Sequence, residues 1–305
     1  MPFLSGRKLR RGGTRGNPLR VPWIVAFPSL AFTIAIHFLP VVVGLWYAFT
    51  DWDGLSPNAN WIGLANFRTI FAHPATRSAL WNTLLITGVF VVAVNVAGLA
   101  LAVALNRSVK SRHVLRSLFF LPFVLMPLAS GYIWRYIFDY TGVLNRFLQV
   151  VGLEEWVRPW FADPSTVLWT IVVVLIWQYS GLAMVFYLAG LQGVSDELWE
   201  AAAIDGASTW MRFRRITVPL LAPAFTVSLV FTTITGFRLF DQIIALTGGG
   251  PVYASETLAT QVWKQSFVNG NFGLGSALAL MLTGLIVVVA VTQLVVLGRR
   301  EAAAA

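Results

Sequence analysis

Polar and charged side chains lie inside long apolar stretches of this chain, and they are the residues that could do chemistry. An ionisable or amide group within a membrane-spanning segment is a candidate for contact with a bound solute. The candidates are Arg238, Asp241, Gln242, Asn82, Asn95, Gln178 and Tyr179. Arg238 and Asp241 are three residues apart, so they could instead neutralise each other on one helix turn. For each of the uncharged residues, holding helices together is the more common role.

Other kinds of chemistry find little support in the sequence. The chain has no cysteine, and its three histidines, His37, His73 and His113, are too far apart for metal-ligand spacing. The triplet 248–250 is rich in glycine but lacks the Lys-Ser/Thr of an ATP-binding phosphate loop. We therefore expect no metal, no cofactor on this chain and no enzymatic activity.

The composition places these residues in a membrane protein. Of the 305 residues, 57% are hydrophobic and only 11% are charged, against about 25% charged in a soluble domain. Mean hydropathy is +0.72. In such a chain the net charge of +9 indicates basic loops at one membrane face rather than nucleic-acid binding. Lipid is the expected surrounding, and no nucleic acid is expected as a partner.

Six apolar segments are long enough to cross a bilayer, which takes about 20 residues. We therefore predict an all-α polytopic membrane protein with a six-span domain over residues 21–298. The predicted spans are about 21–50, 79–106, 115–138, 167–190, 217–246 and 276–298. A basic tail, 1–20, precedes them, and a short tail, 299–305, follows.

The distribution of basic residues predicts the orientation. Fifteen of the 22 Lys and Arg residues fall in the two tails and in the second and fourth connections, whereas five fall in the other connections. Because basic loops stay in the cytoplasm, both termini are expected to be cytoplasmic.

The segment 195–219, between the fourth and fifth spans, is unusual because it is charged and helix-forming. Ser195 can cap a helix, Gly206 interrupts that helix in a turn, and Pro219 opens the next span. This predicts a helix–turn–helix along the cytoplasmic membrane face. Resting in the lipid headgroups is an alternative role, although its acidic residues disfavour contact with an anionic leaflet.

This segment resembles the signature of membrane subunits of binding-protein-dependent ABC importers. That signature has Glu-Ala-Ala, a glycine after three residues, then nine residues, isoleucine, any residue, leucine and proline. The matching residues are Glu200, Ala201, Ala202, Gly206, Ile216 and Pro219. Val218 stands where leucine is usual, and Asp205-Gly206-Ala207 is typical of the sugar-transport branch.

A second stretch resembles the segment after the fifth span in permeases of the maltose and glycerol-phosphate type. It consists of Leu246, Thr247, Gly248, Gly249, Gly250 and Pro251, followed by Ser255-Glu256-Thr257. The resemblance to this family covers nearly the whole chain, with six expected spans, cytoplasmic termini and the signature before the fifth span.

The resemblance implies a mechanism and a set of partners. Segment 195–219 would be a coupling element seated on a separate ATP-binding subunit, which carries the ATP and Mg²⁺. A second permease subunit, favoured to be a distinct chain, and an external solute-binding protein would complete the importer. The chain itself would form the path for a sugar or polyol across a bacterial plasma (inner) membrane. The alternatives are an ion-coupled secondary transporter, for which deep acidic residues are scarce, and a non-transport scaffold subunit.

Overall fold

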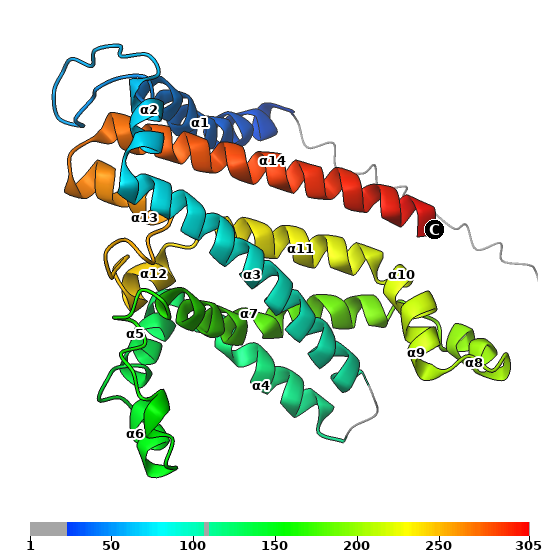
Figure 1. Cartoon of the computed structure of the whole chain (residues 1–305). Helices are drawn as coiled ribbons and strands as arrows, with labels where there is room; N and C mark the ends of the chain where they lie inside the picture. Colours follow the sequence, from blue (N-terminus) through cyan, green and yellow to red (C-terminus); the bar gives the residue numbers. More distant parts are fainter. Residues whose placement is uncertain (1–22, 107–109, 305) are drawn as a thin grey trace, which may run out of the picture. The chain divides into compact units, whose positions relative to one another are not determined.

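We describe the protein from a computed structural model that covers residues 23–106 and 110–304 (Figure 1). The predicted basic tail 1–20, Arg107 and Ala305 lie outside the described residues. The described part is helical, and its one extended pairing is an isolated bridge between Thr50 and Trp61. The expected all-α class is therefore confirmed.

The chain divides into two units, residues 1–44 and residues 45–305. The described part of the first unit belongs to helix α1 (Trp23–Tyr47), which contains Pro28 and Pro40. The second unit holds the rest of the helices and every candidate residue. Its α-helices are α2 (Ala65–Ala72), α3 (Pro74–Leu105), α4 (Arg112–Val124), α5 (Pro127–Ile137), α6 (Val143–Val150), α7 (Val167–Leu191), α8 (Asp196–Ile204), α9 (Thr209–Arg212), α10 (Val218–Leu220), α11 (Ala222–Phe237), α12 (Asp241–Leu246), α13 (Leu258–Trp263) and α14 (Phe272–Ala304). Two π-helical turns, Phe213–Thr217 and Lys264–Val268, extend α9 and α13, and Glu154–Trp156 forms a short 3₁₀ turn.

Four of the described helices, α1, α3, α7 and α14, are individually long and apolar enough to cross a membrane. Two further segments are bent pairs. Helices α4 and α5 meet at 96°, and the 209–220 segment meets α11 at 67°, so the number of spans is four, or up to six if each pair counts as one.

The predicted spans 115–138 and 217–246 are therefore not continuous straight helices. Leu125 and Met126 are extended immediately before Pro127, because a residue that precedes proline is disfavoured in the helical region. In the other segment α11 ends at Phe237, and α12 begins only at Asp241. That second break places two charged residues at helix ends instead of on one helix turn.

Helices α3 and α7 form the centre of the second unit, with α4 and α11 packed against them. A Cβ atom on Gly98 of α3 would lie 2.5 Å from the Cβ of Ala183 on α7. A Cβ on Gly181 of α7 would lie 1.9 Å from the carbonyl oxygen of Phe119 on α4. Small residues thus allow these helices to approach closely. The helix that Gly98 of α3 packs against is α7 of the same chain.

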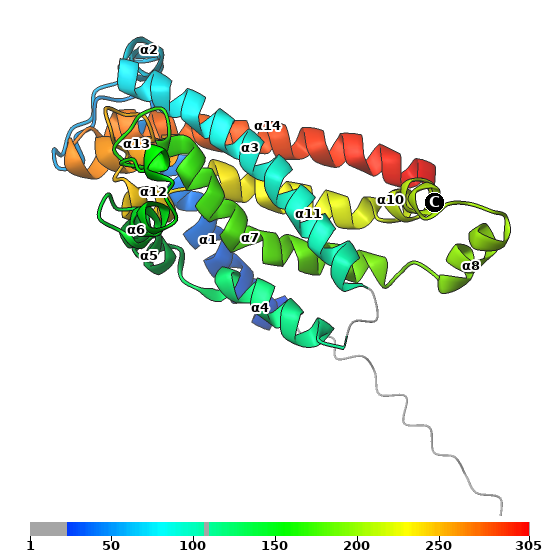
Figure 2. The same ribbon diagram turned by 60° about the horizontal axis from the view of Figure 1, so that its bottom comes forward.

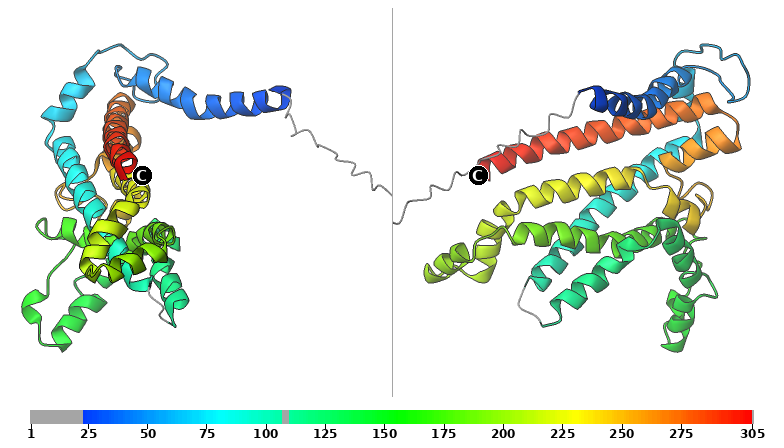
Figure 3. Two further views of the ribbon diagram at one scale, coloured as in Figure 1. Left: turned by 90° about the vertical axis from the view of Figure 1, so that its right-hand side faces the viewer. Right: turned by 180° about the vertical axis from the view of Figure 1, so that it is seen from behind.

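Segment 195–219 and the loop 246–251 lie at opposite ends of the second unit (Figures 1 and 2). Helices α8 and α9 are at the end that also holds the C-terminal ends of α3 and α14. Helices α2, α12 and α13 are at the other end, as the right-hand view of Figure 3 also shows. The long helices connect one end to the other.

Candidate functional site: a polar pocket and a helix–turn–helix

A polar pocket opens at the break between α11 and α12. It has a volume of about 300 Å³, and Tyr179, Arg238, Asp241 and Gln242 contribute to its wall together with Pro127 at the start of α5. The side chains of Arg238 and Asp241 are exposed. Although both are among the described residues, they form no ion pair with each other. The helix break therefore leaves both charges available to the pocket, contrary to mutual neutralisation on one turn.

One buried amide, Gln242, lines this pocket and belongs to a hydrogen-bond network behind it. Gln242 Nε2 donates to Tyr179 Oη at 3.2 Å and to Gln178 Oε1 at 3.5 Å. Ser130 Oγ donates to the same Gln178 oxygen at 3.0 Å, and Gln178 Nε2 donates to the carbonyl of Leu125 at 3.2 Å. The network joins α5, α7 and α12. It also gives the Leu125 carbonyl at the α4–α5 bend a hydrogen-bond donor, which lipid could not supply.

The other two polar candidates lie elsewhere. Asn95 Oδ1 accepts from Tyr187 Oη at 2.7 Å and from Ser228 Oγ at 2.6 Å, while its Nδ2 donates to Thr232 Oγ1 at 3.0 Å. These bonds join α3 to α7 and α11. Asn82 Nδ2 donates to the carbonyls of Tyr253 at 3.1 Å and Glu256 at 3.0 Å. The pocket therefore brings together Arg238, Asp241, Gln242 and Tyr179, but neither asparagine.

The loop 246–251 is folded against its own chain at the end remote from α8. Thr247 Oγ1 and Ser255 Oγ are 2.7 Å apart, and Gly249 N donates to Thr247 Oγ1 at 3.1 Å. Ser255 Oγ also donates to the carbonyl of Gly250. Leu246 and Gly249 are buried, Gly248 is exposed, and Pro251 is half-buried.

The sequence analysis missed an ion pair between a half-buried lysine and a buried glutamate next to this loop. Lys264 Nζ contacts Glu256 Oε1, and the Glu256 side chain is only 1% exposed. Glu256 enters the sequence analysis only as part of the Ser-Glu-Thr sequence, and Lys264 is one of the five basic residues counted in the other connections. The signal that could have found the pair was a single glutamate and a single lysine in an otherwise uncharged stretch.

Segment 195–219 forms two short helices joined by a glycine turn. Ser195 Oγ accepts from Glu197 N at 3.2 Å and caps α8, and Ser208 Oγ accepts from Met211 N at 3.3 Å and caps α9. Between them Gly206 has φ +80°, a conformation that a residue with a Cβ rarely adopts. The side-chain caps and the glycine explain why the chain forms this turn here.

Most residues of the signature are on the surface of this segment. Glu200, Ala201, Asp205, Gly206 and Pro219 are exposed, and Ala202, Ala207 and Ile216 are half-buried. The apolar side chain of Ile204 is 86% exposed. The two short helices thus offer an exposed surface of acidic and small apolar residues.

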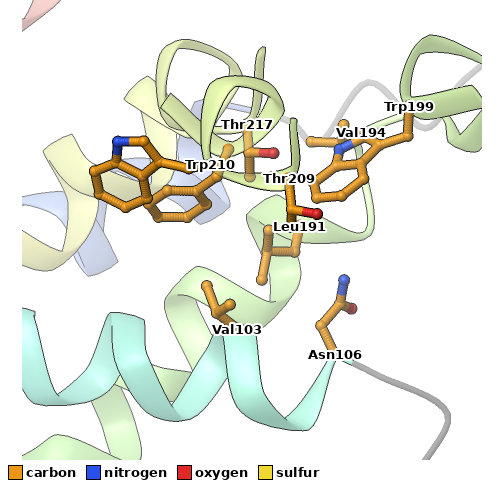
Figure 4. A pocket seen from close by; sticks show the side chains of 9 residues that line it. Val103, Asn106, Leu191, Val194, Trp199, Thr209, Trp210 and Thr217 are labelled. Carbon is orange, nitrogen blue, oxygen red and sulfur yellow. The ribbon is translucent and has the colours of Figure 1, made fainter. Parts of the chain in front are cut away.

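An apolar pocket of about 670 Å³ lies between this segment and the ends of α3 and α7 (Figure 4). Its wall includes Val103 of α3, Leu191 of α7, and Trp199 and Trp210 of the short helices. A cavity therefore separates part of segment 195–219 from the ends of α3 and α7, so side chains do not pack continuously between them there.

The comparisons with known proteins agree with one another. Residues 94–300 match the family model described as binding-protein-dependent transport system inner membrane component. The chain is 34% identical over 283 residues to the probable starch degradation products transport system permease protein AmyD of Thermoanaerobacterium thermosulfurigenes, covering 92% of this chain and 94% of that protein. It is 30% identical over 263 residues to the trehalose/maltose transport system permease protein MalF of Thermococcus litoralis, covering 86% and 88%.

The fold is shared with a solved structure. A chain of a bacterial alginate ABC transporter, in complex with an alginate pentasaccharide-bound periplasmic protein, superimposes with a TM-score of 0.78 at 21% identity, covering 92% of this chain and 94% of that one. Two thirds of the sequence match the family model, and the curated relatives cover nearly the whole chain. The chain belongs to the family of binding-protein-dependent transport system inner membrane components.

Proposed function

We propose that this chain is a permease subunit of an ATP-driven importer and forms part of the translocation path for a sugar or a related polyol. The observation that carries the proposal is the exposed helix–turn–helix, which holds the importer signature at one end of a bundle of apolar helices. The relatives named for starch degradation products and for trehalose/maltose support the choice of sugars.

The coupling role is assigned to α8, the Gly206 turn and α9. Their exposed Glu200, Asp205 and Ile204 suit a groove on a separate ATP-binding subunit, which would carry the ATP and Mg²⁺. The π-helical turn and Pro219 join this element to α11, so a push on α8 is transmitted to the helix that ends at the polar pocket. Ion-coupled transport is less favoured, because such carriers place acidic residues deep in their spans. Such residues are scarce in the predicted spans of this chain, where Asp241 is the clear case.

The solute is proposed to pass the polar pocket at the α11–α12 break. Tyr179 offers an aromatic face, Gln242 an amide, and Arg238 and Asp241 opposite charges that balance each other across the pocket. This set can exchange hydrogen bonds with hydroxyl groups without favouring a net charge on the solute. A pocket at a break between helices is also able to change shape when α11 moves.

The remaining partners are a second permease, favoured to be a distinct chain, and an external solute-binding protein. The alginate transporter was solved with its periplasmic protein, which supports this arrangement. We place the complex in the bacterial plasma membrane with both termini in the cytoplasm. The C-terminal end of α14 lies at the same end as α8 and α9, as this orientation requires.

Reconstitution tests the proposal. The tagged chain is co-purified with its partners and placed in vesicles with the binding protein, and uptake of labelled maltose, trehalose and maltotriose is measured with and without ATP. We expect ATP-dependent uptake, which Gln242→Leu lowers at least about tenfold, consistent with loss of one or two good hydrogen bonds.

The control is Thr292→Val, at an exposed position of α14 that does not line this pocket, which should leave uptake unchanged. Uptake that continues without the ATP-binding subunit and stops with a protonophore would favour the ion-coupled alternative. Absence of any ATP-binding subunit after co-purification would contradict the coupling assignment.

A further inference from the structure

A second polar pocket, of about 520 Å³, lies at the end of the bundle opposite α8. Its wall is formed by α2, the start of α3, α13 and the π-helical turn that follows α13. This volume is within the range of about 300–1,000 Å³ typical of small-molecule sites. Neither the importer signature nor the pocket at the α11–α12 break contributes to it.

The pocket contains a buried acceptor that has no partner. Glu256 Oε1 contacts Lys264 Nζ, but Glu256 Oε2 is buried and has no hydrogen-bond partner within the described part of the chain. Buried carboxylate oxygens are normally hydrogen-bonded, because leaving one unpaired is unfavourable. The free oxygen of Glu256 thus calls for a donor that comes from outside the chain.

Amide side chains continue from the ion pair along one side of the pocket. Gln265 Nε2 donates to Gln261 Oε1 at 3.2 Å, and Asn269 Nδ2 donates to Gln265 Oε1 at 3.1 Å. The side chain of Asn271 lines the mouth and is exposed. Amides both donate and accept hydrogen bonds, so this row can bind several hydroxyl groups at once.

The charges of the pocket select a neutral ligand. Lys264 would repel a metal ion or organic cation from Glu256, and Glu256 would repel an anion from Lys264. His73 contributes a ring nitrogen that already accepts from Ala75 N at 3.3 Å. An uncharged ligand with many hydroxyl groups can form hydrogen bonds with all these side chains while Glu256 and Lys264 remain paired, so no unpaired charge is buried.

The ion pair is held in place by the chain around it. Asn82 Nδ2 donates to the carbonyl of Glu256, and Thr83 Oγ1 accepts from Leu258 N at 2.9 Å. A Cβ on Gly249 would lie 2.7 Å from Glu256 Cγ, so glycine leaves room for the pair. Tyr253, which lines the pocket, has φ +65°, a strained conformation of the kind that gathers at binding sites.

We propose that the pocket around Glu256 and Lys264 is a second saccharide-binding site, separate from the pocket at the α11–α12 break. Glu256 Oε2 accepts a hydrogen bond from a sugar hydroxyl, Lys264 and the amides donate to others, and the ring of Tyr253 contacts the sugar face. The choice of sugars as ligands rests on the proposed function. The site gives the loop 246–251 and the Ser-Glu-Thr sequence that follows it a role in holding solute before it reaches the centre of the bundle.

Single-cysteine protection tests the site, since the natural chain has no cysteine. Thr69→Cys places a thiol in the wall of this pocket without altering the proposed binding groups, and Thr235→Cys places one in the pocket at the α11–α12 break. The full chain in lipid nanodiscs, with its partners bound, is treated with a small methanethiosulfonate reagent in the presence of maltose, trehalose or mannitol. We expect maltose or trehalose to slow modification of the thiol at position 69 at least threefold and Glu256→Gln to remove that protection.

Two controls keep the result interpretable. Asn271→Leu changes an exposed side chain at the mouth and should weaken protection without affecting folding, so it replaces Glu256→Gln if that variant unfolds. Thermal unfolding of each variant separates folding defects from binding defects. Protection of the thiol at position 235 alone, or protection at position 69 that survives both variants, would overturn the second site. ATP-dependent uptake with no protection at position 69 would refute this site while leaving the proposed function intact.

Discussion

The guanidinium of Arg212 lies over the indole ring of Trp199, with Cζ 5.2 Å from the ring centroid. Arg212 Nη1 also donates to the carbonyl oxygen of Trp199 at 3.4 Å. Because Trp199 is on α8 and Arg212 is on α9, this contact spans the Gly206 turn. It holds the two short helices at a fixed angle.

Replacing Arg212 should therefore loosen α8 before it affects the long helices. In Arg212→Lys the charge stays, but the planar contact with the ring is lost, which removes about 0.5–1 kcal/mol. We expect amide hydrogen exchange in α8 to become roughly two- to fivefold faster, with α3 and α7 unchanged. Arg214→Lys, at an exposed position of the following turn, serves as the matched control. Equal exchange rates in both variants would show that the ring contact does not stabilise the angle.

The Gly206 turn should be essential for coupling. Its φ of +80° disfavours a Cβ, although nothing lies within 4 Å of that position, so Gly206→Ala introduces backbone strain of about 1–2 kcal/mol without a steric clash. We expect insertion to be normal, and substrate-stimulated ATP hydrolysis and uptake to fall together. Both are measured in vesicles containing the assembled importer.

Gly152 provides the control for this experiment. It has φ +76° and open space around its missing Cβ, but it lies in the connection after α6. Gly152→Ala should carry a similar strain and leave ATP hydrolysis coupled to uptake. If Gly206→Ala behaves like Gly152→Ala, the turn has no special part in coupling, and Glu200→Lys, which changes the exposed surface of α8, becomes the decisive variant.

Close packing between α3 and α7 leads to a third prediction. A side chain larger than glycine at position 98 meets the backbone of α7, since the Cβ alone would lie 2.9 Å from the Met184 nitrogen. Overpacking of this kind costs about 1–3 kcal/mol or more. We expect Gly98→Ile to lower the thermal unfolding midpoint and the yield of folded protein.

The same helix offers a neutral comparison. Gly88 is exposed and has nothing within 4 Å of its missing Cβ, so Gly88→Ile should leave the unfolding midpoint of the chain nearly unchanged. A comparable loss of stability in both variants would mean that helix propensity, and not contact with α7, explains the effect of Gly98→Ile.

The connection after α1 contains an acid-sensitive turn. Asp53 accepts from the Ser56 hydroxyl and from the backbone N–H groups of Ser56 and Leu55, and these bonds lower the pKa of Asp53 from 3.8 to about 2. Because the folded-state pKa is depressed, the stabilisation is complete above about pH 3.8 and is lost as the pH falls through about 2.

A carboxyl-carbon NMR titration of labelled protein checks this value. The Asp53 signal, identified by its disappearance in Asp53→Asn, should titrate with a midpoint near pH 2. Ser56→Ala removes the hydroxyl donor, so we expect the midpoint to move upward toward 3.8. A midpoint already at the ordinary aspartate value in the unaltered protein would show that the turn is open in solution.

Sequence patterns predicted the helical class and the family because both depend on local signals. Long apolar runs predict helices in lipid, and the residues Glu200, Gly206 and Pro219 lie close together in the chain. Ser195 and Ser208 cap helices through hydrogen bonds to residues two or three positions away. Such signals can be recognised in the sequence without knowledge of the fold.

The breaks and the long-range pairs could not be predicted in the same way. Arg238 and Asp241 have the spacing of an ion pair, but α11 ends at Phe237 and the spacing rule then fails. Asn95 and Gln178 both lie in apolar stretches of the sequence. Gln178, however, is hydrogen-bonded to Gln242 at the α11–α12 pocket, whereas Asn95 is hydrogen-bonded to Thr232 of α11. Whether an amide joins helices or faces a pocket depends on contacts more than 40 residues away in the sequence, such as the one between Ser130 and Gln178.

The length of α14 has a consequence for any soluble subunit that contacts this chain. The apolar stretch 277–297 is roughly 31 Å long at about 1.5 Å per residue, which already fills a hydrocarbon layer of about 30 Å. The helix nevertheless continues through Arg299 to Ala304. Its last two turns therefore extend beyond the apolar stretch, at the end of the second unit that also holds α8 and α9 (Figure 1). A protein that binds at that end would meet a second helical projection, which limits the directions of its approach.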